Sequence, residues 1–384
     1  MIKKLIFIVS TLSLCLSSTF CGYKQYLATA STDSTINIYN INQLKNKKPR
    51  KKTLKETEAF TDIAFSPDGK YLASILYDSR IIIFKTEEDF KKLTLQKIKN
   101  KKENLNFDRP CLAFSPDSKY LVTCDGNNKI IIWKTTNFAK PHPKIYKTFK
   151  EKNVETFSPL KFTKTKKKYS LASGFDILRG FTLSAKIQMW ETNKWKPFFT
   201  LNVIEGSSIL SMAFSYNGKY LAIGLSNSKI KILDLSDLKP ITTLEGHNRG
   251  VASVEFSHDS KYLASGSKDR TTKIWDTETW TLITTLKKHK KGVTSVAFSI
   301  DDQYLATGSR DETTKIWEKG EKKTWRGKKT PQKTWKKPKL INTLKNHTDD
   351  VTSVVFSPKI YPLKEKEMRE KDITERIGFI SEKL

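Results

Sequence analysis

The sequence is poor in the side chains that build metal centres and phosphate sites. It has five histidines and four cysteines among 384 residues, and these do not cluster with carboxylates at the spacing of metal ligands. It also lacks a Gly-x-x-x-x-Gly-Lys-Ser/Thr segment or another glycine loop that would cradle phosphate. We therefore predict no metal site, no cofactor and no small-molecule substrate.

Acidic residues are scarce relative to basic ones. The chain has 40 Asp and Glu against 70 Lys and Arg, a formal net charge of +30. Such a charge favours nucleic acid, acidic lipid or acidic protein as partners, although a general bias toward Lys, Asn and Ile would also produce it. With 37% hydrophobic and 11% aromatic residues, the chain can bury a sizeable core, which excludes wholesale disorder.

No hydrophobic run is long enough to span a bilayer comfortably. The longest lies at the start, in "MIKKLIFIVSTLSLCLSSTFCG", where two lysines precede an apolar stretch at 5–16. This layout predicts a secretory signal over residues 1–22, cleaved after Cys21, and export to the periplasm of a bacterial-type cell or secretion. The alternative is a degenerate strand, because residues 20–29 align with 298–307, and the protein would then be cytoplasmic. After signal removal we expect no stable membrane span.

Only two cysteines lie outside this segment. Cys111 and Cys124 fall on what we expect to be adjacent strands, so a disulfide can form if the strand register places both on one face. A single pair is weak evidence, and we favour two buried free thiols.

What the chain does have is a repeat. "FSPDGKYLAS" at 65–74 recurs at 114–123, 214–223, 256–265 and 298–307, and a degenerate copy occupies 157–173. Each copy follows an apolar strand such as "VASVEF", turns through Pro, Asp, Asn or Gly, and continues into strands such as "KIIIWK" and "TTKIWD". The unit is a β-meander of about 40–50 residues that must stack on its neighbours to bury both faces.

The best-preserved copy resembles the WD-repeat family of β-propellers. Gly246 and His247 match the Gly-His pair of that family, and Trp275 and Asp276 match its Trp-Asp pair. The resemblance is close over 240–318 and periodic over 24–357. It implies one four-stranded blade for each repeat, arranged around a central channel.

Counting strands predicts seven blades and a closed ring. Hairpins of second and third strands lie at 26–40, 71–85, 120–134, 169–190, 220–234, 262–276 and 304–318. First strands lie near 61–65, 109–114, 152–157, 208–214, 251–256, 293–298 and 351–356. The two sets are offset by one, so we predict an all-β, seven-bladed β-propeller over 23–358 in which the C-terminal strand completes the N-terminal blade. The charged tail at 359–384 is either a decayed strand or a surface helix.

Fixed offsets also predict buried polar tetrads. In the resembled family an Asp binds a His, the His binds a Ser or Thr, and that hydroxyl binds a Trp ring. The same residue types suit a serine hydrolase, but the set recurs with Thr for Ser, and the serine lies in a strand rather than on a nucleophile elbow. We therefore predict structural roles and no enzyme activity. The predicted tetrads are His247, Ser265, Asp269 and Trp275; His289, Thr307, Asp311 and Trp317; and His347, Thr29, Asp33 and Tyr39.

Two connections are unusually long and basic. Residues 318–339 contain ten Lys and Arg and two tryptophans, and 43–52 form the same connection in the first blade. We expect them to share one face. The candidate binding residues are Lys322, Lys323, Trp325, Arg326, Lys328, Lys329, Trp335, Lys336, Lys337, Lys47, Lys48, Arg50 and Lys51. The predicted function is a non-catalytic protein-interaction scaffold with an unidentified protein partner; the alternative is polyanion binding through these loops, with lysines on phosphates and tryptophans stacking.

Overall fold

A computed structural model describes residues 23–97, 111–125, 129–138, 145–150, 156–164, 169–179, 182–321 and 333–360. The predicted signal at 1–22, the loop at 322–332 and the tail from 361 lie outside these residues. The chain divides into two units, Gln25–Pro358 and the two chain ends. In the unit formed by the two chain ends, Lys24 and Ile360 exchange two backbone hydrogen bonds of 2.8 Å.

The described residues form 28 strands and two short 3-10 helices. Blades one to three contain β28 (Val351–Phe356), β1 (Tyr26–Ser31), β2 (Thr35–Asn40) and β3 (Lys51–Lys55); β4 (Phe60–Phe65), β5 (Tyr71–Leu76), β6 (Arg80–Lys85) and β7 (Lys91–Lys97); and β8 (Leu112–Phe114), β9 (Tyr120–Asp125), β10 (Lys129–Lys134) and β11 (Ile145–Lys150). The 3-10 helices are η1 (Ile41–Gln43) and η2 (Thr135–Asn137).

Blades four and five contain β12 (Thr156–Lys164), β13 (Tyr169–Arg179), β14 (Thr182–Glu191) and β15 (Lys196–Glu205), followed by β16 (Ile209–Phe214), β17 (Tyr220–Leu225), β18 (Ile230–Asp234) and β19 (Pro240–Leu244). Blades six and seven contain β20 (Val251–Phe256), β21 (Tyr262–Ser267), β22 (Thr272–Asp276) and β23 (Leu282–Leu286), followed by β24 (Val293–Phe298), β25 (Tyr304–Ser309), β26 (Thr314–Glu321) and β27 (Lys333–Leu344).

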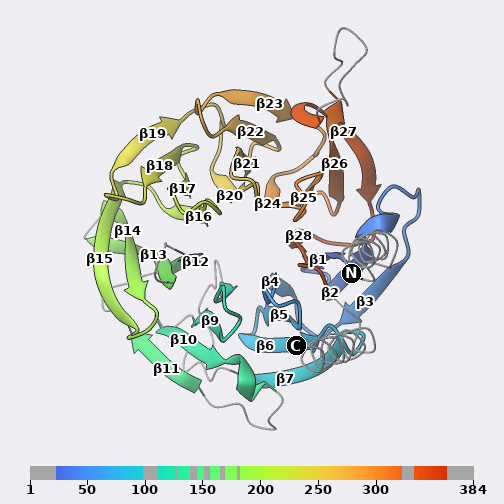
Figure 1. Cartoon of the computed structure of the whole chain (residues 1–384), viewed down its shortest axis with the longest axis horizontal. Coiled ribbons are helices and arrows are strands. Elements are labelled where there is room, and N and C mark those ends of the chain that lie inside the picture. The colour runs from blue at the N-terminus through green and yellow to red at the C-terminus, as the bar shows by residue number, and fades with distance from the viewer. Residues whose placement is uncertain are drawn as a thin grey trace, which may run out of the picture. The chain divides into compact units, whose positions relative to one another are not determined.

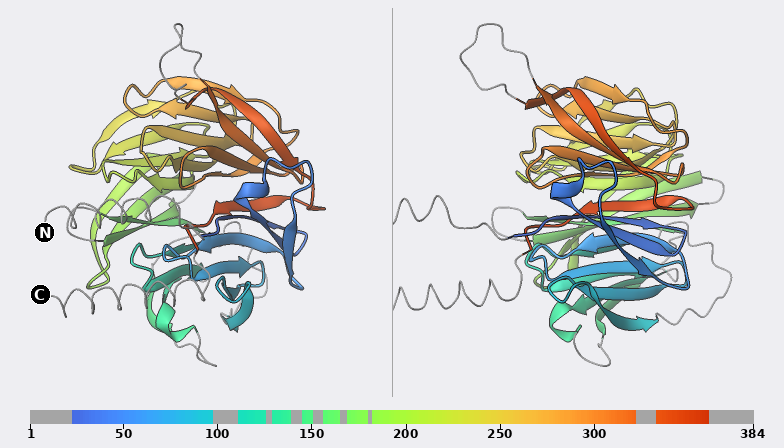
Figure 2. Two further views of the ribbon diagram at one scale, coloured as in Figure 1. Left: turned by 45° about the vertical axis from the view of Figure 1, so that its right-hand side comes forward. Right: turned by 90° about the vertical axis from the view of Figure 1, so that its right-hand side faces the viewer.

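The seven sheets stand around a central channel, with the first strand of each blade innermost (Figure 1). Seen from the side, the strands cross the thickness of the propeller and their connections gather on two faces (Figure 2). Each blade is an antiparallel meander, and in blade six tight polar turns join strands of which the second and third are almost wholly buried. The predicted seven-bladed, all-β propeller is confirmed.

The ring closes through the two ends of the propeller. Strand β28 pairs antiparallel with β1, with Leu27 opposite Phe356 and Ala28 opposite Val355. The other edge of β1 pairs with β2, so β1 lies inside a four-stranded sheet built from both ends of the sequence. The predicted completion of the N-terminal blade by the C-terminal strand is therefore present in the structure.

Neighbouring blades pack closely at this closure. Val351 and Val354 of β28 are 0% and 2% exposed and belong to one apolar cluster with Ala306 and Ile316 of blade seven. A Cβ atom added to Gly308 would lie 2.8 Å from Val351 Cγ1 and 2.9 Å from Val354 Cγ1. Blade seven thus approaches β28 too closely for a larger residue at this position, which makes the closing strand part of the core.

Blade four differs from the sequence prediction. Its first strand was expected near 152–157, but β12 extends from Thr156 to Lys164, and its register with β13 shifts between Phe157 and Leu160. The expected position was wrong because the degenerate copy carries extra residues, and the β-bulge realigns the strand so that Leu160 enters the core.

The two central cysteines also differ from the favoured prediction. Cys111 and Cys124 form a disulfide with a Cα–Cα distance of 5.6 Å. The Cys124 amide donates a 3.1 Å hydrogen bond to the Cys111 carbonyl, which places the residues opposite each other on neighbouring strands. The preference for free thiols was therefore wrong, because the register of blade three brings both side chains to one face.

The closure predicts that the C-terminal strand is required for stability. A chain that ends at Asn346 lacks β28 and exposes the edge of β1, whereas a chain that ends at Ile360 keeps the strand. We expect the shorter chain to unfold at least about 10 °C below the longer one in a thermal melt, and to aggregate more readily. Equal melting temperatures would show that β28 is dispensable.

Candidate functional site

The three predicted tetrads lie at one end of the strands. The connections before β20, β24 and β28 and the turns after β21, β25 and β1 meet there, and we call this surface of blades six, seven and one the tetrad face. Three equivalent backbone hydrogen bonds of 3.0 Å join the connection to the turn in each blade. They run from Lys268 to Gly250, from Arg310 to Gly292 and from Thr32 to Asp350.

In blade six the four predicted residues form one hydrogen-bonded chain. The Trp275 ring N–H donates to Ser265 Oγ over 2.9 Å, and Ser265 Oγ lies 2.8 Å from His247 Nε2. His247 Nδ1 lies 2.7 Å from Asp269 Oδ2. Because the Asp269 carboxylate can only accept, Nδ1 carries the proton, and the serine hydroxyl donates to Nε2.

Blade seven repeats the arrangement with threonine. The Trp317 ring N–H donates to Thr307 Oγ1 over 3.2 Å, and Thr307 Oγ1 lies 2.8 Å from His289 Nε2. His289 Nδ1 lies 3.0 Å from Asp311 Oδ2. The substitution of Thr for Ser therefore leaves the polar chain intact.

Blade one joins residues from the two ends of the propeller but uses tyrosine differently. His347 lies 2.9 Å from Asp33 Oδ2 and 2.8 Å from Thr29 Oγ1, as predicted. Tyr39 was expected to bind Thr29, yet its hydroxyl accepts a 2.7 Å hydrogen bond from Asn346. The phenol cannot reproduce the geometry of an indole N–H, so that part of the prediction was wrong.

Sequence reasoning also missed a member of this group. The Asn37 amide lies 3.2 Å from His347 Nε2, and its oxygen accepts a 2.7 Å hydrogen bond from Thr53. Asn37 occupies the position that Lys273 has in blade six. The asparagine in place of this lysine was the sequence signal that could have identified it. Blades three and four keep a shorter version, in which Trp133 and Trp190 donate to Thr123 and Ser173.

Burial and hydrogen bonds set the protonation states of the three tetrad aspartates and of His347. Burial alone would raise the pKa of Asp269, but hydrogen bonds from His247 and Thr271 lower it well below its usual value. The pKa of Asp311 falls for the same reasons. In blade one the pKa of Asp33 is lowered, and burial also lowers the pKa of His347 despite the opposing Asp33 carboxylate. The aspartates are therefore ionised, and His347 is neutral near pH 7.

The tetrads have no access to substrate. Ser265 is 0% exposed, and its oxygen already accepts from Trp275 while its proton lies on His247. Thr307 is also 0% exposed with the same partners in blade seven. A nucleophile must reach an electrophile, so the geometry favours the structural interpretation of these residues.

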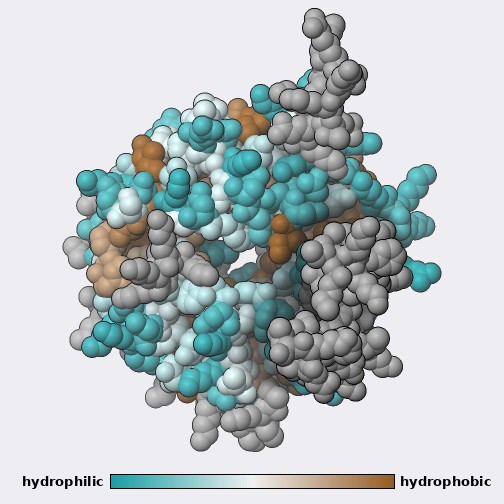
Figure 3. Space-filling model, in the orientation of Figure 1, coloured by the Kyte–Doolittle hydropathy of each residue, from teal (hydrophilic) through white to brown (hydrophobic). Residues whose placement is uncertain are grey.

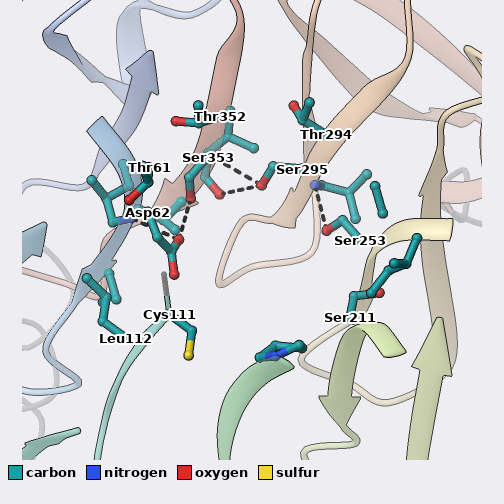
Figure 4. A pocket seen from close by; sticks show the side chains of 18 of the residues that line it. Thr61, Asp62, Cys111, Leu112, Ser211, Ser253, Thr294, Ser295, Thr352 and Ser353 are labelled. Carbon is teal, nitrogen blue, oxygen red and sulfur yellow. Dashed lines mark hydrogen bonds between the residues drawn. The ribbon is translucent and has the colours of Figure 1, made fainter. Parts of the chain in front are cut away.

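The central channel has a cavity of about 670 Å³ and is visible as an opening in the surface (Figure 3). Its wall carries a hydroxyl at the third position of several first strands, Ser211, Ser253, Ser295 and Ser353, with Asp62 in blade two (Figure 4). Ser353 donates to Asp62 over 3.0 Å, Ser295 accepts from the Val354 amide over 3.1 Å, and Ser253 accepts from the Val296 amide over 3.1 Å. These hydroxyls join adjacent blades.

Two carboxylates of the channel wall, Asp62 and Glu255, are half-buried. Burial raises the pKa of Glu255 to about 7, although Lys161 and His258 act in the opposite direction. Burial also raises the pKa of Asp62, again against Lys161. Within the described ranges, no group of three His, Cys, Asp or Glu residues is placed to hold a metal ion.

The predicted basic surface lies at the opposite ends of the strands from the tetrad face. Lys47, Lys48, Arg50 and Lys51 are exposed around the start of β3, and Lys336 and Lys337 are exposed on β27. The two segments do meet, because Lys45 and Glu318 form a 2.8 Å ion pair and Asn342 donates to the Leu44 and Asn46 carbonyls over 2.8 Å. Lys322, Lys323, Trp325, Arg326, Lys328 and Lys329 lie outside the described residues, and polyanion binding here stays a prediction.

Trp335 does not belong to that surface. It is 0% exposed and packs in the core between blades six and seven, with its ring centroid 5.5 Å from that of Phe298. At four other junctions between blades, an aromatic ring from the turn before the outermost strand packs against the tyrosine that begins β1, β5, β9 or β17. The two ring centroids lie 5.1–5.4 Å apart. The prediction of a stacking residue was wrong because Trp335 fills the same kind of junction beside Tyr262.

Fold and geometry together define a WD-repeat propeller with structural tetrads. Residues 49–85, 110–134, 196–234, 238–276, 280–318 and 338–359 match the WD40 family, the WD domain or G-beta repeat. The chain belongs to this family. The matches leave out β1 and β2 of blade one, β7 of blade two, β11 of blade three and β12–β14 of blade four.

A curated relative resembles part of the chain. It is the WD repeat-containing protein VIP3 of Arabidopsis thaliana, which is 34% identical over 80 residues. The similarity covers 18% of this chain and 25% of the relative. Among the described residues, no helix is long and apolar enough to cross a membrane.

The tetrad of blade six predicts a stability effect at Ser265. The change Ser265→Ala leaves the Trp275 N–H and His247 Nε2 buried without their partner, which costs about 1–3 kcal/mol of unfolding free energy. Urea unfolding followed by tryptophan fluorescence measures it. The matched change Ser236→Ala, in an exposed turn, should alter the unfolding free energy by less than about 0.5 kcal/mol. A loss no greater than this control would argue against the structural role.

The lowered pKa values predict a loss of stability in acid. A group whose pKa is lower in the folded chain contributes stability at higher pH and loses it as pH falls. For His347 the loss begins below its usual 6.5, and for the three aspartates below 3.8. Between pH 7 and 5 the raised pKa of Glu255 adds stability as pH falls, so the loss at His347 is read as a difference: the melting temperature of the unaltered chain should fall more, or rise less, than that of His347→Gln, and both should fall below pH 4. Parallel profiles for the two proteins would contradict this origin.

The burial of Trp335 predicts a large cost for its removal. Truncation by Trp335→Ala leaves a cavity at the junction of blades six and seven and should cost about 3–5 kcal/mol of unfolding free energy. Phe198→Ala is the control, because Phe198 is 58% exposed on β15 and its removal opens no core cavity. Denaturant unfolding compares the two variants, and similar small losses would place Trp335 outside the core.

Proposed function

We propose that this chain is a non-catalytic scaffold that binds a protein partner through its tetrad face. WD40 propellers are typically protein-interaction scaffolds, and this chain belongs to that family. The supporting observation is that each connection combines a histidine held by hydrogen bonds with exposed side chains beside it. His247, His289 and His347 are held in the tetrads, while the side chains that follow them, such as Arg249 and Lys291, are exposed.

The geometry of the face favours recognition over chemistry. Each connection is fixed to a turn by a backbone hydrogen bond and by an aspartate that accepts from the residue after the histidine, for example the Asn248 amide over 3.0 Å. A face whose backbone is already ordered loses little entropy on binding. Loops on such a rigid scaffold are where binding residues concentrate.

Cross-linking tests this function. The full chain is tagged, isolated from the cells that produce it, treated with a lysine-reactive reagent and mapped by mass spectrometry. We expect a stoichiometric protein partner linked to Lys268, Lys287 or Lys290 on the tetrad face. Lys219 and Lys261, exposed at the opposite ends of the strands, serve as internal controls. Absence of a partner, or links confined to the control lysines, would refute the proposal.

We also propose that the protein is exported. The charged and apolar layout of residues 1–22 supports this, and so does the Cys111–Cys124 disulfide, because such bonds persist in oxidising compartments. The intact mass of protein from its own cells tests it. We expect a chain that begins near Gly22 and whose two cysteines resist alkylation until reduction. A chain that retains Met1 and reacts at both thiols would exclude export.

A further inference from the structure

The tetrad face is divided by charge. At the position two residues after the tetrad histidine, blades six and seven carry Arg249 and Lys291, and blade one carries Asp349. At the position before the turn aspartate, blades six and seven carry Lys268 and Arg310, whereas blade one has threonine. The same backbone frame therefore presents cations on two adjacent blades and carboxylates on the third.

The cations surround a hollow between blades six and seven. It has a volume of about 490 Å³. We call it the basic hollow, and it is lined by Asn248, Arg249, Lys268, Asp269, Arg270, Lys290, Lys291 and Gly292. Five of these eight residues are cationic, and all five are exposed to solvent.

Few of these cations are neutralised by the protein. Lys291 lies 3.7 Å from Glu312 in an exposed pair, which contributes little. Within the described residues, Arg249, Arg270 and Lys290 form no ion pair within 4.0 Å. The carboxylate of Asp269, which also lines the hollow, is engaged by His247, Asn248 and Thr271 over 2.7, 3.0 and 2.6 Å.

The hollow is built on a rigid frame. The Lys268 amide is bound to the Gly250 carbonyl over 3.0 Å, and the Arg270 amide is bound to the Ser267 carbonyl over 3.1 Å. The connection before β24 is fixed through the Lys290 amide, which donates to Asp311 over 2.7 Å. Like charges held together in this way repel one another, and an anionic ligand relieves that repulsion.

The neighbouring carboxylates limit which anion fits. Asp349 and Asp350 lie on the same face in blade one, and Asp350 is 3.6 Å from Arg310. A long polyanion such as nucleic acid would be attracted to the basic hollow and repelled where it continued onto blade one. A protein segment with a few clustered carboxylates followed by neutral or basic residues satisfies both regions.

We propose that the basic hollow binds an acidic segment of a protein partner, with Asp or Glu carboxylates accepting hydrogen bonds from Arg249 and Lys290. This inference rests on the proposed scaffold function and specifies the chemistry of the partner. Arginine suits the role because its planar guanidinium can bind a carboxylate through two N–H groups.

Peptide binding to the full chain tests the proposal. The probe is a fluorescein-labelled peptide with four consecutive glutamates between Gly and Ser flanks, and binding is followed by anisotropy. The variant Arg249→Gln with Lys290→Gln removes two charges from the hollow. The matched control, Lys219→Gln with Lys261→Gln, removes two exposed charges from the opposite ends of the strands. Thermal melts verify that both variants are folded.

We expect the hollow variant to bind the peptide at least about tenfold more weakly, because hydrogen bonds to charged groups are lost, and the control to change less than twofold. Asp349→Lys extends the basic region and should tighten binding a few-fold, a gain that misfolding cannot produce. Equal weakening of the two double variants, or no binding by the unaltered chain, would overturn the proposal.

Two further measurements separate the competing explanations. An oligothymidylate that binds more tightly than the peptide, and whose binding is lost in Lys47→Gln with Lys48→Gln, would replace this proposal with polyanion binding on the opposite face. Peptide-independent dimers in sedimentation that vanish in the Arg249 and Lys290 variant would assign the hollow to a second copy of the chain. If that variant still captures the cross-linked partner in full, the scaffold function stands and the acidic-segment inference fails.

Discussion

The antiparallel pair of β1 and β28 is the contact on which the propeller depends. Each blade leaves one face of its sheet to be covered by the next, so an open row of blades would expose apolar surface at both ends. Pairing Leu27 with Phe356 and packing Val351 against blade seven removes both ends at once. The first and last strands are more than 300 residues apart, yet they belong to the same sheet.

Buried polar groups then fix how the blades present their connections. In blade six the donors run in one direction, from Trp275 through Ser265 and His247 to Asp269, and every buried member has a partner. The residue types are those of a hydrolase, and burial decides between the two interpretations. A serine that is 0% exposed cannot attack a substrate, but it can hold a connection against a turn. The exposed side chains beside the tetrads remain available for recognition.

A second set of contacts joins the blades to one another. Serines around the channel bind the first strand of the next blade, and aromatic rings near the opposite face pack against tyrosines of the preceding blade. Trp335 serves this purpose between blades six and seven. On the tetrad face, by contrast, the hollow between blades six and seven is lined mainly by cations such as Arg249 and Lys290.

The sequence by itself determined the repeat, the number of blades and the pairing of His347 with Asp33, because these follow from spacing along the chain and from the need to cover every sheet edge. Spacing did not determine which atoms Tyr39 would reach, whether Trp335 would face water, or that Cys111 and Cys124 would meet. Only the tertiary structure decided these points. Each depends on the neighbouring strand or blade, whose register and bulges set the direction of a side chain, and a one-residue shift reverses that direction.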